Sequence, residues 1–487
     1  MIRKLAIGFA TIMCCAGFLA CNSSVEPIQS TSSCAAVRTF SFQPDKKIMP
    51  RLDSVFFSID LVTGRIFNAE PMPYGTDVTR LVPVLTTLEG VSSATFAVTR
   101  AGMADTVYNY VTSMTDSIDF TNPVRLTLVS LDGLVTRDYT IYVNVHKEKA
   151  DSLTWSQVDR RTLPTSLGIV SGQRTVRFGN SLRCLTTARG KYCMASLEND
   201  INDLNGSTAD LGQWDLRDVN FGFTPQISSF AATDDALYLL SEDGELYKST
   251  DGQAWTSTSL QWHSIYGAYG KTLLGSVQTA DGWKIQTYPS GETTDLPQGM
   301  PVAKTSVPVI YNFQMSDVPQ MLIVGGRKAD GSLSTDTWGY DGRTWMKISR
   351  RGLPEGLLTP AVAPYFMLEY NKDWTSDMIP SLIAIGGQKA DGTVSRKVYI
   401  SDDYGITWNE ASDLLQLPTY IPSLYDAQMF TISRILTGDI LPARISRPIE
   451  KWDCPYIYMF GGVLEDGQTS NNVWRGVINQ FSYKPVM

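Results

Sequence analysis

The side chains best suited to binding gather in two segments near the C-terminal end of the chain. Tyr370 and Trp374 lie in the first segment, and Arg444, Arg447 and Trp452 lie in the second. Aromatic rings stack on sugars and on cations, and arginine and aromatic groups form the centres of many protein interfaces. These five residues are therefore the candidate ligand-binding site. An alternative is that both segments only cover the fold beneath them or dock against the N-terminal part of the chain.

Side chains for catalysis or metal binding are scarce. The chain has two histidines, His146 and His263, and scattered cysteines, so we expect no metal-ligand cluster and no cofactor. A serine-hydrolase triad would have to use His263, which lies in a segment without a motif. Paired carboxylates for glycoside hydrolysis stay open, because 49 acidic residues offer many combinations. No catalytic residue is assigned.

The N-terminus has the pattern of an export signal. Two positive charges precede an apolar run of about 15 residues, shorter than the ~18 to 20 needed to cross a bilayer. Residues 18–21, Phe-Leu-Ala-Cys, resemble a bacterial lipobox, which implies a signal peptide over residues 1–20 and a lipid on Cys21. Ordinary cleavage nearby is the alternative. The Ser-rich stretch over residues 21–48 is expected to be a flexible tether.

A lipid anchor makes the membrane a partner of this protein. We expect an outer membrane lipoprotein whose folded part faces either the outside or the periplasm. Nucleic acid is not an expected partner, because 49 acidic residues outnumber 41 basic ones and the sequence has no basic run.

Cys184 and Cys193 bracket a short segment that has the pattern of a hairpin. Outside the cytoplasm, two cysteines on neighbouring strands can form a disulfide. The alternative is a pair of buried thiols, and the sequence leaves both open.

Residues 49–149 alternate apolar and polar side chains between turns and contain no tryptophan. Val124, Leu126 and Leu128 alternate with polar residues, an Asp-Gly turn follows, and the alternation resumes on the return strand. About 100 residues of short strands favour a β-sandwich. Residues 118–145 resemble the immunoglobulin-like modules that act as spacers in many Bacteroidales surface lipoproteins.

Residues 150–487 contain a repeated pattern. VGGRKADGSLSTDTW, IGGQKADGTVSRKVY and FGGVLEDGQTSNNVW place a Gly pair, an Asp-Gly turn and a large aromatic at fixed spacing. Each copy has the pattern of one antiparallel sheet, and weaker copies extend upstream at spacings of about 40 to 63 residues. We expect an all-β propeller of six blades, with seven as the alternative, closed by pairing of the segment after Trp155 with the last strands. Its outer strands are expected to begin near Trp155, Trp214, Trp255, Thr293, Trp345 and Trp408.

The repeats resemble known propeller motifs. The pairs Gly325-Gly326, Gly386-Gly387 and Gly461-Gly462 resemble the kelch repeat, and SDDYGITW over residues 401–408 matches the Asp-box pattern. The whole chain resembles a Bacteroidales lipoprotein family with an N-terminal immunoglobulin-like domain and a C-terminal kelch-type, galactose-oxidase-like β-propeller. We expect the motif residues to be structural, because glycine permits positive φ, Asp binds turn amides and Trp packs between sheets. A copper site would need histidine ligands, and the chain has only His146 and His263, one of them in the other domain.

The resemblance implies a non-catalytic, lipid-anchored binding or scaffolding protein of the cell envelope. Its ligand would be a glycan or a partner protein of a nutrient-uptake assembly, held by the long loops that join the first two strands of the last blades. The alternative is a propeller-fold glycoside-active enzyme, sialidase-like or another glycosidase. Two carboxylates about 5 to 10 Å apart near the propeller axis would indicate the enzyme, and an aromatic platform would indicate the binder.

Overall fold

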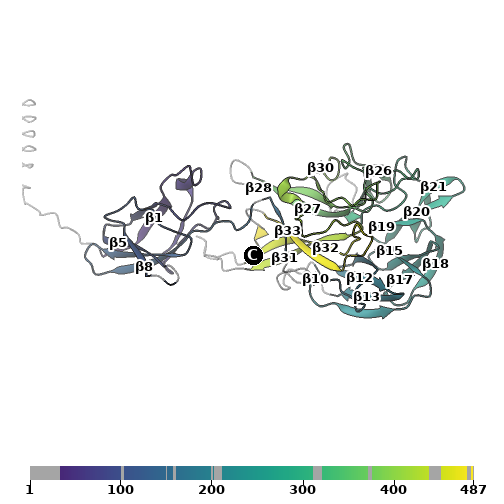
Figure 1. Ribbon diagram of the computed structural model, residues 1–487, viewed down its shortest axis with the longest axis horizontal. Helices are drawn as coiled ribbons and strands as arrows, with labels where there is room; N and C mark the ends of the chain where they lie inside the picture. The colour runs from purple at the N-terminus through teal and green to yellow at the C-terminus, as the bar shows by residue number, and fades with distance from the viewer. Residues whose placement is uncertain are drawn as a thin grey trace, which may run out of the picture. The chain divides into compact units, whose positions relative to one another are not determined.

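The computed structural model describes residues 33–99, 102, 104–149, 151–156, 161–198, 201, 211–310, 321–370, 376–437, 451–479 and 484–485. These residues form two compact units with a boundary between Val145 and His146. Apart from two short 3-10 turns, η1 (Leu52–Ser54) and η2 (Asp413–Leu415), the regular elements described are strands (Figure 1). The all-β prediction is therefore confirmed. Within the described residues, no helix is long and apolar enough to cross a membrane.

The first unit contains two sheets. The smaller sheet pairs β1 (Val37–Phe42) with β4 (Pro83–Thr87) in antiparallel fashion. The larger sheet has the order β2-β3-β8-β7-β5-β6, in which only the β3–β8 pair is parallel. Its strands are β2 (Ser58–Asp60), β3 (Arg65–Phe67), β5 (Val91–Val98), β6 (Thr106–Asn109), β7 (Val124–Ser130) and β8 (Thr136–Tyr142).

A single apolar core joins the two sheets of this unit. The expected alternation on β7 is present, since Val124, Leu126 and Leu128 are fully buried. Phe40 and Phe42 of β1 reach the same core. Part of the predicted tether over residues 21–48 is therefore wrong, because residues 37–42 form a strand whose aromatic side chains are needed to fill the core.

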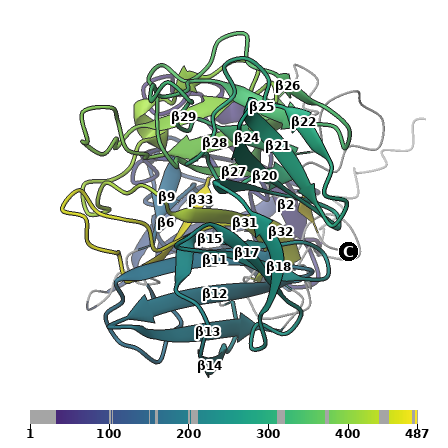
Figure 2. The same ribbon diagram turned by 90° about the vertical axis from the view of Figure 1, so that its right-hand side faces the viewer.

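The second unit contains five four-stranded antiparallel sheets, each built from consecutive strands. Figure 2 shows the order within one of them, where β11 lies near the middle of the unit and β14 lies at its rim. The first two sheets are β11 (Gly172–Phe178), β12 (Ser181–Ala188), β13 (Lys191–Leu197), β14 (Asp215–Val219), and β15 (Pro225–Ala232), β16 (Leu237–Ser241), β17 (Glu245–Ser249), β18 (Thr256–Gln261). The third is β19 (Ser264–Tyr269), β20 (Thr272–Thr279), β21 (Gly282–Tyr288), β22 (Thr293–Asp295). The last two are β23 (Val309–Ile310), β24 (Met321–Val324), β25 (Thr337–Tyr340), β26 (Trp345–Lys347), and β27 (Ala361–Tyr370), β28 (Ser376–Ile385), β29 (Val398–Ser401), β30 (Asn409–Glu410).

A sixth sheet joins the two ends of this unit. It contains β31 (Gln428–Thr437), β32 (Lys451–Phe460) and β33 (Asn472–Ile478), and β34 (Lys484–Pro485) adds to β32. The outer positions beside β33 belong to β9 (Leu153–Trp155) and β10 (Arg161–Thr162), from the start of the unit. The structure therefore contains the expected pairing of the segment around Trp155 with the last strands, and this pairing covers the edge of β33.

The Gly pairs of the repeats lie where neighbouring sheets touch. Gly386 has a φ of 67°, and a Cβ added there would lie 2.1 Å from the carbonyl oxygen of Leu424, in the connection to the next sheet. The N–H of the second glycine, Gly387, donates to that same oxygen at 3.0 Å. Only glycine permits both the positive φ and the close approach, so the pair is structural, as expected.

The Asp box is a self-bonded turn. Ser401 Oγ donates to Asp403 Oδ1 at 2.8 Å, and the same carboxylate oxygen accepts the N–H of Thr407 at 2.8 Å. The indole N–H of Trp408 donates to Thr337 Oγ1 of the preceding sheet at 2.8 Å, and Trp408 is 1% exposed. These residues connect two sheets, and these contacts are structural, as expected.

Candidate functional site

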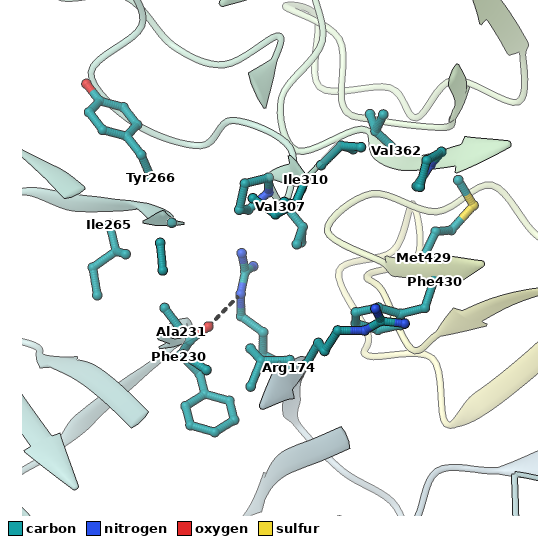
Figure 3. A pocket seen from close by; sticks show the side chains of 18 of the residues that line it. Arg174, Phe230, Ala231, Ile265, Tyr266, Val307, Ile310, Val362, Met429 and Phe430 are labelled. Atoms are coloured by element: carbon teal, nitrogen blue, oxygen red, sulfur yellow. Dashed lines mark hydrogen bonds between the residues drawn. The ribbon is translucent and has the colours of Figure 1, made fainter. Parts of the chain in front are cut away.

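The first strands of the six sheets surround one cavity of about 210 Å³. We call it the axial chamber, and one residue from each of these strands defines it: Arg174, Phe230, Ile265, Val309, Val362 and Phe430. Figure 3 shows these strands approaching from all sides. The sheets therefore lie around a common axis, and this chamber lies on it.

The chamber has mostly apolar walls. Figure 3 shows Arg174 pointing into it, where the Arg174 Nε–H donates to the Phe230 carbonyl oxygen at 3.2 Å. The Tyr266 ring points away from the middle of the chamber, and its hydroxyl donates to the Pro301 carbonyl oxygen at 2.7 Å. Burial raises the pKa of Tyr266 far above its ordinary value, so this hydroxyl remains a neutral donor.

A second, polar cavity of about 260 Å³ lies at the N-terminal ends of the same strands. It shares Arg174, Ser229 and Ile265 with the axial chamber, so the two cavities are adjacent. We call it the axial mouth, and its principal residues are Arg174, His263, Lys304, Thr359, Gln388 and Asp426. Convergent polar groups at the end of a scaffold axis are the usual form of a small-molecule site.

An ion pair lies at the base of the mouth. Arg174 Nη1 donates to Asp426 Oδ1 at 2.9 Å, and the two side chains are only 14% and 18% exposed. Burial raises the pKa of the Asp426 carboxyl, although the charges of Arg174 and Lys304 favour its ionised form. Among the described residues, Lys304 has no salt-bridge partner.

Three residues of the mouth have a strained backbone. Lys304, Thr359 and Asp426 have φ values of 55°, 43° and 54°, in the left-handed region that a β-branched residue such as Thr359 rarely adopts. They are linked in series, because the Thr359 N–H donates to the Lys304 oxygen at 2.9 Å and the Asp426 N–H donates to the Thr359 oxygen at 3.0 Å. Each such conformation costs about 1–3 kcal/mol and is commonest at functional sites.

Two further groups complete the mouth. Thr359 Oγ1 is buried and has no hydrogen-bond partner in the described part of the chain. The His263 ring packs edge-on against Trp283 with the ring centroids 4.8 Å apart, and partial burial lowers the pKa of His263. At neutral pH His263 is therefore uncharged. In the described ranges, no group of three His, Cys, Asp or Glu side chains could hold a metal ion.

The predicted loop site falls largely on residues whose side chains the structure does not describe. Trp374, Arg444 and Arg447 lie outside the described residues. Tyr370 is the last residue of β27 and Trp452 lies on β32, so both residues lie on strands, whereas the sequence predicted loops at these positions. Cys21, the predicted lipid attachment site, also lies outside the described residues.

Cys184 and Cys193 lie on the adjacent strands β12 and β13 and are free thiols in the structure. The register pairs Cys184 with Ala195 and Thr186 with Cys193, so the two cysteines are diagonal neighbours rather than directly opposite. Burial raises the pKa of Cys184 to about 12, with the neighbouring Cys193 adding to the shift. The structure therefore has the two buried thiols that the sequence left as the alternative to a disulfide.

The sequence did not reveal the axial mouth. Arg174 lies in the most degenerate repeat, and Lys304, Thr359 and Asp426 are three different residue types. The only property that these three residues share in the sequence is their position, because each precedes the first strand of a recognisable repeat. Connections of unequal length between these residues and the Gly pairs hid this equivalence.

The fold and the axial site define a β-propeller protein. Residues 149–486 match the model of the DUF6242 beta propeller domain, and residues 30–143 match that of the DUF6242 N-terminal domain, described as a domain of unknown function. The chain therefore belongs to the DUF6242 family, which supports the propeller that the sequence predicted.

Solved structures of other proteins resemble the chain more distantly. YjhT shares 10% identity at a TM-score of 0.40, with 64% of this chain and 96% of that chain covered. A protein of unknown function from Bacteroides thetaiotaomicron shares 10% identity at a TM-score of 0.30, over 93% and 99% of the two chains. YCF48 from Cyanidioschyzon merolae shares 12% identity at a TM-score of 0.26, over 67% and 98%. No curated protein matches the chain.

Proposed function

We propose that this protein is a non-catalytic binding protein of the cell envelope that holds part of a glycan or of a partner protein in the axial mouth. A lipid on Cys21 anchors it in the outer membrane, with its folded part facing the outside or the periplasm. Residues 1–20 are the cleaved signal peptide in this proposal.

The chemistry of the axial mouth carries the proposal. Hydrolysis by paired carboxylates needs two of them about 5 to 10 Å apart. Over the described residues that line the chamber and the mouth, Asp426 is the one carboxylate, and Arg174 already neutralises it. Such a site can hold a ligand by hydrogen bonds and charge, and this supports binding over glycoside hydrolysis.

We infer six blades from the six sheets around the axis, and a kelch type from the three Gly pairs that contact a neighbouring sheet or the chain leading to it. Two sheets around one core support an immunoglobulin-like sandwich for the first unit, which acts as a spacer.

A glycan array tests the proposed function. The probe is the chain from residue 22 onward, which lacks the lipid site and keeps β1. Arg174→Gln/Asp426→Asn removes the ion pair without leaving a lone buried charge, and it should abolish binding to any glycan that the wild type retains. Trp374→Ala is the matched variant for the loop site and should leave binding unchanged.

Two results of the array would contradict the proposal. Turnover of an arrayed sugar would establish an enzyme. Loss of binding in Trp374→Ala together with normal binding in the double variant would move the site to the loops.

The anchor is tested separately in cells. Cys21→Ser should shift the protein from the membrane fraction to the soluble fraction and prevent incorporation of labelled palmitate. Membrane retention and labelling of Cys21→Ser would contradict a lipid at this position.

A further inference from the structure

The axial mouth is cationic although the chain as a whole is acidic. Arg174 and Lys304 carry two positive charges against the single negative charge of Asp426, whereas the chain has a formal net charge of −8. A focused charge of one sign inside a cleft attracts ligands of the opposite sign. The mouth therefore favours a ligand with one negative charge.

The Arg174 guanidinium is held in place but keeps free donors. An arginine has five N–H donors, of which Arg174 uses one on Asp426 Oδ1 and one on the Phe230 carbonyl oxygen. Three N–H groups remain for a ligand in the described part of the structure. A planar carboxylate matches this fork better than a neutral hydroxyl group does, because it can accept two parallel hydrogen bonds.

Uncharged polar groups around the two cations suit ligand hydroxyl groups. Thr359 Oγ1 is buried without a partner, and Gln226, Ser228, Ser264 and Gln388 also line the mouth. Its volume of about 260 Å³ lies below the ~300–1,000 Å³ of pockets for drug-sized ligands. The space therefore suits one small ring or chain bearing hydroxyl groups.

The strained residues are the ones that present these groups. Lys304, Thr359 and Asp426 each keep a left-handed backbone at equivalent places before β23, β27 and β31. Glycine would relieve this strain, but it would remove the ammonium, the hydroxyl and the carboxylate from the mouth.

We propose that the axial mouth binds a small hydroxylated carboxylate, a sugar acid, whose carboxylate lies between Arg174 and Lys304 and whose hydroxyl groups bond to Thr359 and its polar neighbours. This inference rests on the proposed function and specifies the ligand class of the same site.

Calorimetric titration of the chain from residue 22 onward tests the ligand class. The probes are D-glucuronate, D-glucose and acetate, which carry both recognised features, the hydroxyl groups alone and the carboxylate alone. D-Glucuronate should bind at least about tenfold more tightly than either of the others, because a hydrogen bond to a charged group contributes about one tenfold step in affinity or more.

Variants then locate the contact. Lys304→Gln should weaken binding of D-glucuronate about tenfold and leave D-glucose unaffected. The double variant Arg174→Gln/Asp426→Asn should weaken binding of D-glucuronate to the same extent. Thermal melting should show that this variant is folded. Lys271→Gln is the charge control, because Lys271 is 75% exposed and lines neither axial cavity, and it should leave every affinity unchanged.

The outcomes separate this inference from the proposed function. Equal affinities for D-glucose and D-glucuronate would overturn the inference that the ligand is a sugar acid, but they would still support glycan binding in the axial mouth. Acetate binding as tightly as D-glucuronate would overturn the role of the hydroxyl groups. No binding of the three probes would overturn the inference, and an array without any bound glycan would also overturn glycan binding as the proposed function, leaving only the partner protein.

Discussion

Asp426 competes with an acidic ligand for Arg174. While its carboxyl is ionised, it accepts a hydrogen bond from Arg174 Nη1 and cancels one of the two positive charges of the mouth. Once protonated, it no longer cancels that charge and leaves the mouth with both. Because burial raises the pKa of Asp426, this change occurs at a higher pH than for an ordinary aspartate, which titrates near about 3.9.

Binding of D-glucuronate should therefore tighten as the pH falls from about 7.5 to about 4.5, a range in which the sugar carboxylate itself stays ionised. Two other titratable groups line the mouth beside the cations Arg174 and Lys304. Neutral Tyr425 has a raised pKa, so it does not contribute, and His263 gains a proton below its ordinary range, which acts in the same direction. Titration calorimetry at several pH values measures the effect. Asp426→Asn should bind tightly throughout and keep only the contribution of His263, and a full pH dependence in this variant would contradict the role of Asp426.

Thr359 is expected to lower the stability of the fold through its strained backbone and to support ligand binding through its hydroxyl group. Thr359→Gly should raise the free energy of unfolding by about 0.5–1 kcal/mol, because glycine adopts a φ of 43° without strain and this gain exceeds its entropic cost. Urea unfolding measures the change. The same variant should weaken sugar binding, because it lacks the buried hydroxyl. Thr359→Ala keeps the Cβ and loses the hydroxyl, so it should share the weaker binding without the added stability.

Single residues were predictable where their role is local. The Asp-box and Gly-pair residues follow from turn geometry, which depends on a few neighbouring positions. The pair formed by Arg174 and Asp426 spans 252 residues of sequence, and only closure of the ring brings them together. No local pattern encodes such a contact, so the sequence did not indicate the axial mouth. The binding role expected of Tyr370 and Trp374 stays a prediction.

At the scale of the strand and its neighbours, the Gly pairs allow two sheets to approach closely. Gly386→Ala should lower the free energy of unfolding by roughly 2–4 kcal/mol, because the new Cβ would lie 2.1 Å from a backbone oxygen of Leu424 and the φ of 67° would be strained. Chemical denaturation measures this loss. Gly392→Ala has a similar φ of 86° but nothing within 4 Å of its Cβ, so it should cost only about 1 kcal/mol. Equal losses would show that the contact between sheets adds nothing.

Element boundaries were predictable to different degrees. The outer strands β14, β18, β22, β26 and β30 begin at or next to the expected positions, because each follows an aromatic residue or a tight turn. The loop predicted over residues 370–378 was too long. The strands β27 and β28 pair as far as Tyr370 and Ser376, so part of the expected loop is regular β-structure. Polar residues in this segment, such as Glu369 and Asp377, break the alternation that predicts a strand, so the segment looks like a loop in sequence.

At the scale of the whole second unit, Trp155 contributes to closure of the ring. Its side chain is 2% exposed and packs on Gly476 of β33, where an added Cβ would lie 2.8 Å from the ring. Trp155→Ala should lower the free energy of unfolding by about 3–5 kcal/mol, and Trp155→Phe should lower it less, as equilibrium denaturation can measure. An unchanged midpoint in Trp155→Ala would mean that β9 does not contribute to stability.

The strand arrangement of the second unit was more predictable from the sequence than the axial mouth. Closure followed from one physical requirement, that no sheet edge be left unpaired, together with the repeat count. In the first unit, the amphipathic pattern of β7 and β8 placed the core correctly. The prediction of a tether was wrong over β1, because the sequence of this strand, VRTFSF, is too short and polar to be distinguished from the segment before it.

Ring closure also dictates when this protein can finish folding. Asn479 bonds to Ser152, 327 residues earlier, so β9 leaves the ribosome long before its partner strand has been synthesised. A polypeptide that ends prematurely in the last sheet could not close the ring. It would leave two unpaired strand edges, one on each side of the missing strand. Such truncated products are natural targets for proteases, so the propeller is protected only after β33 has been synthesised and has paired with β9.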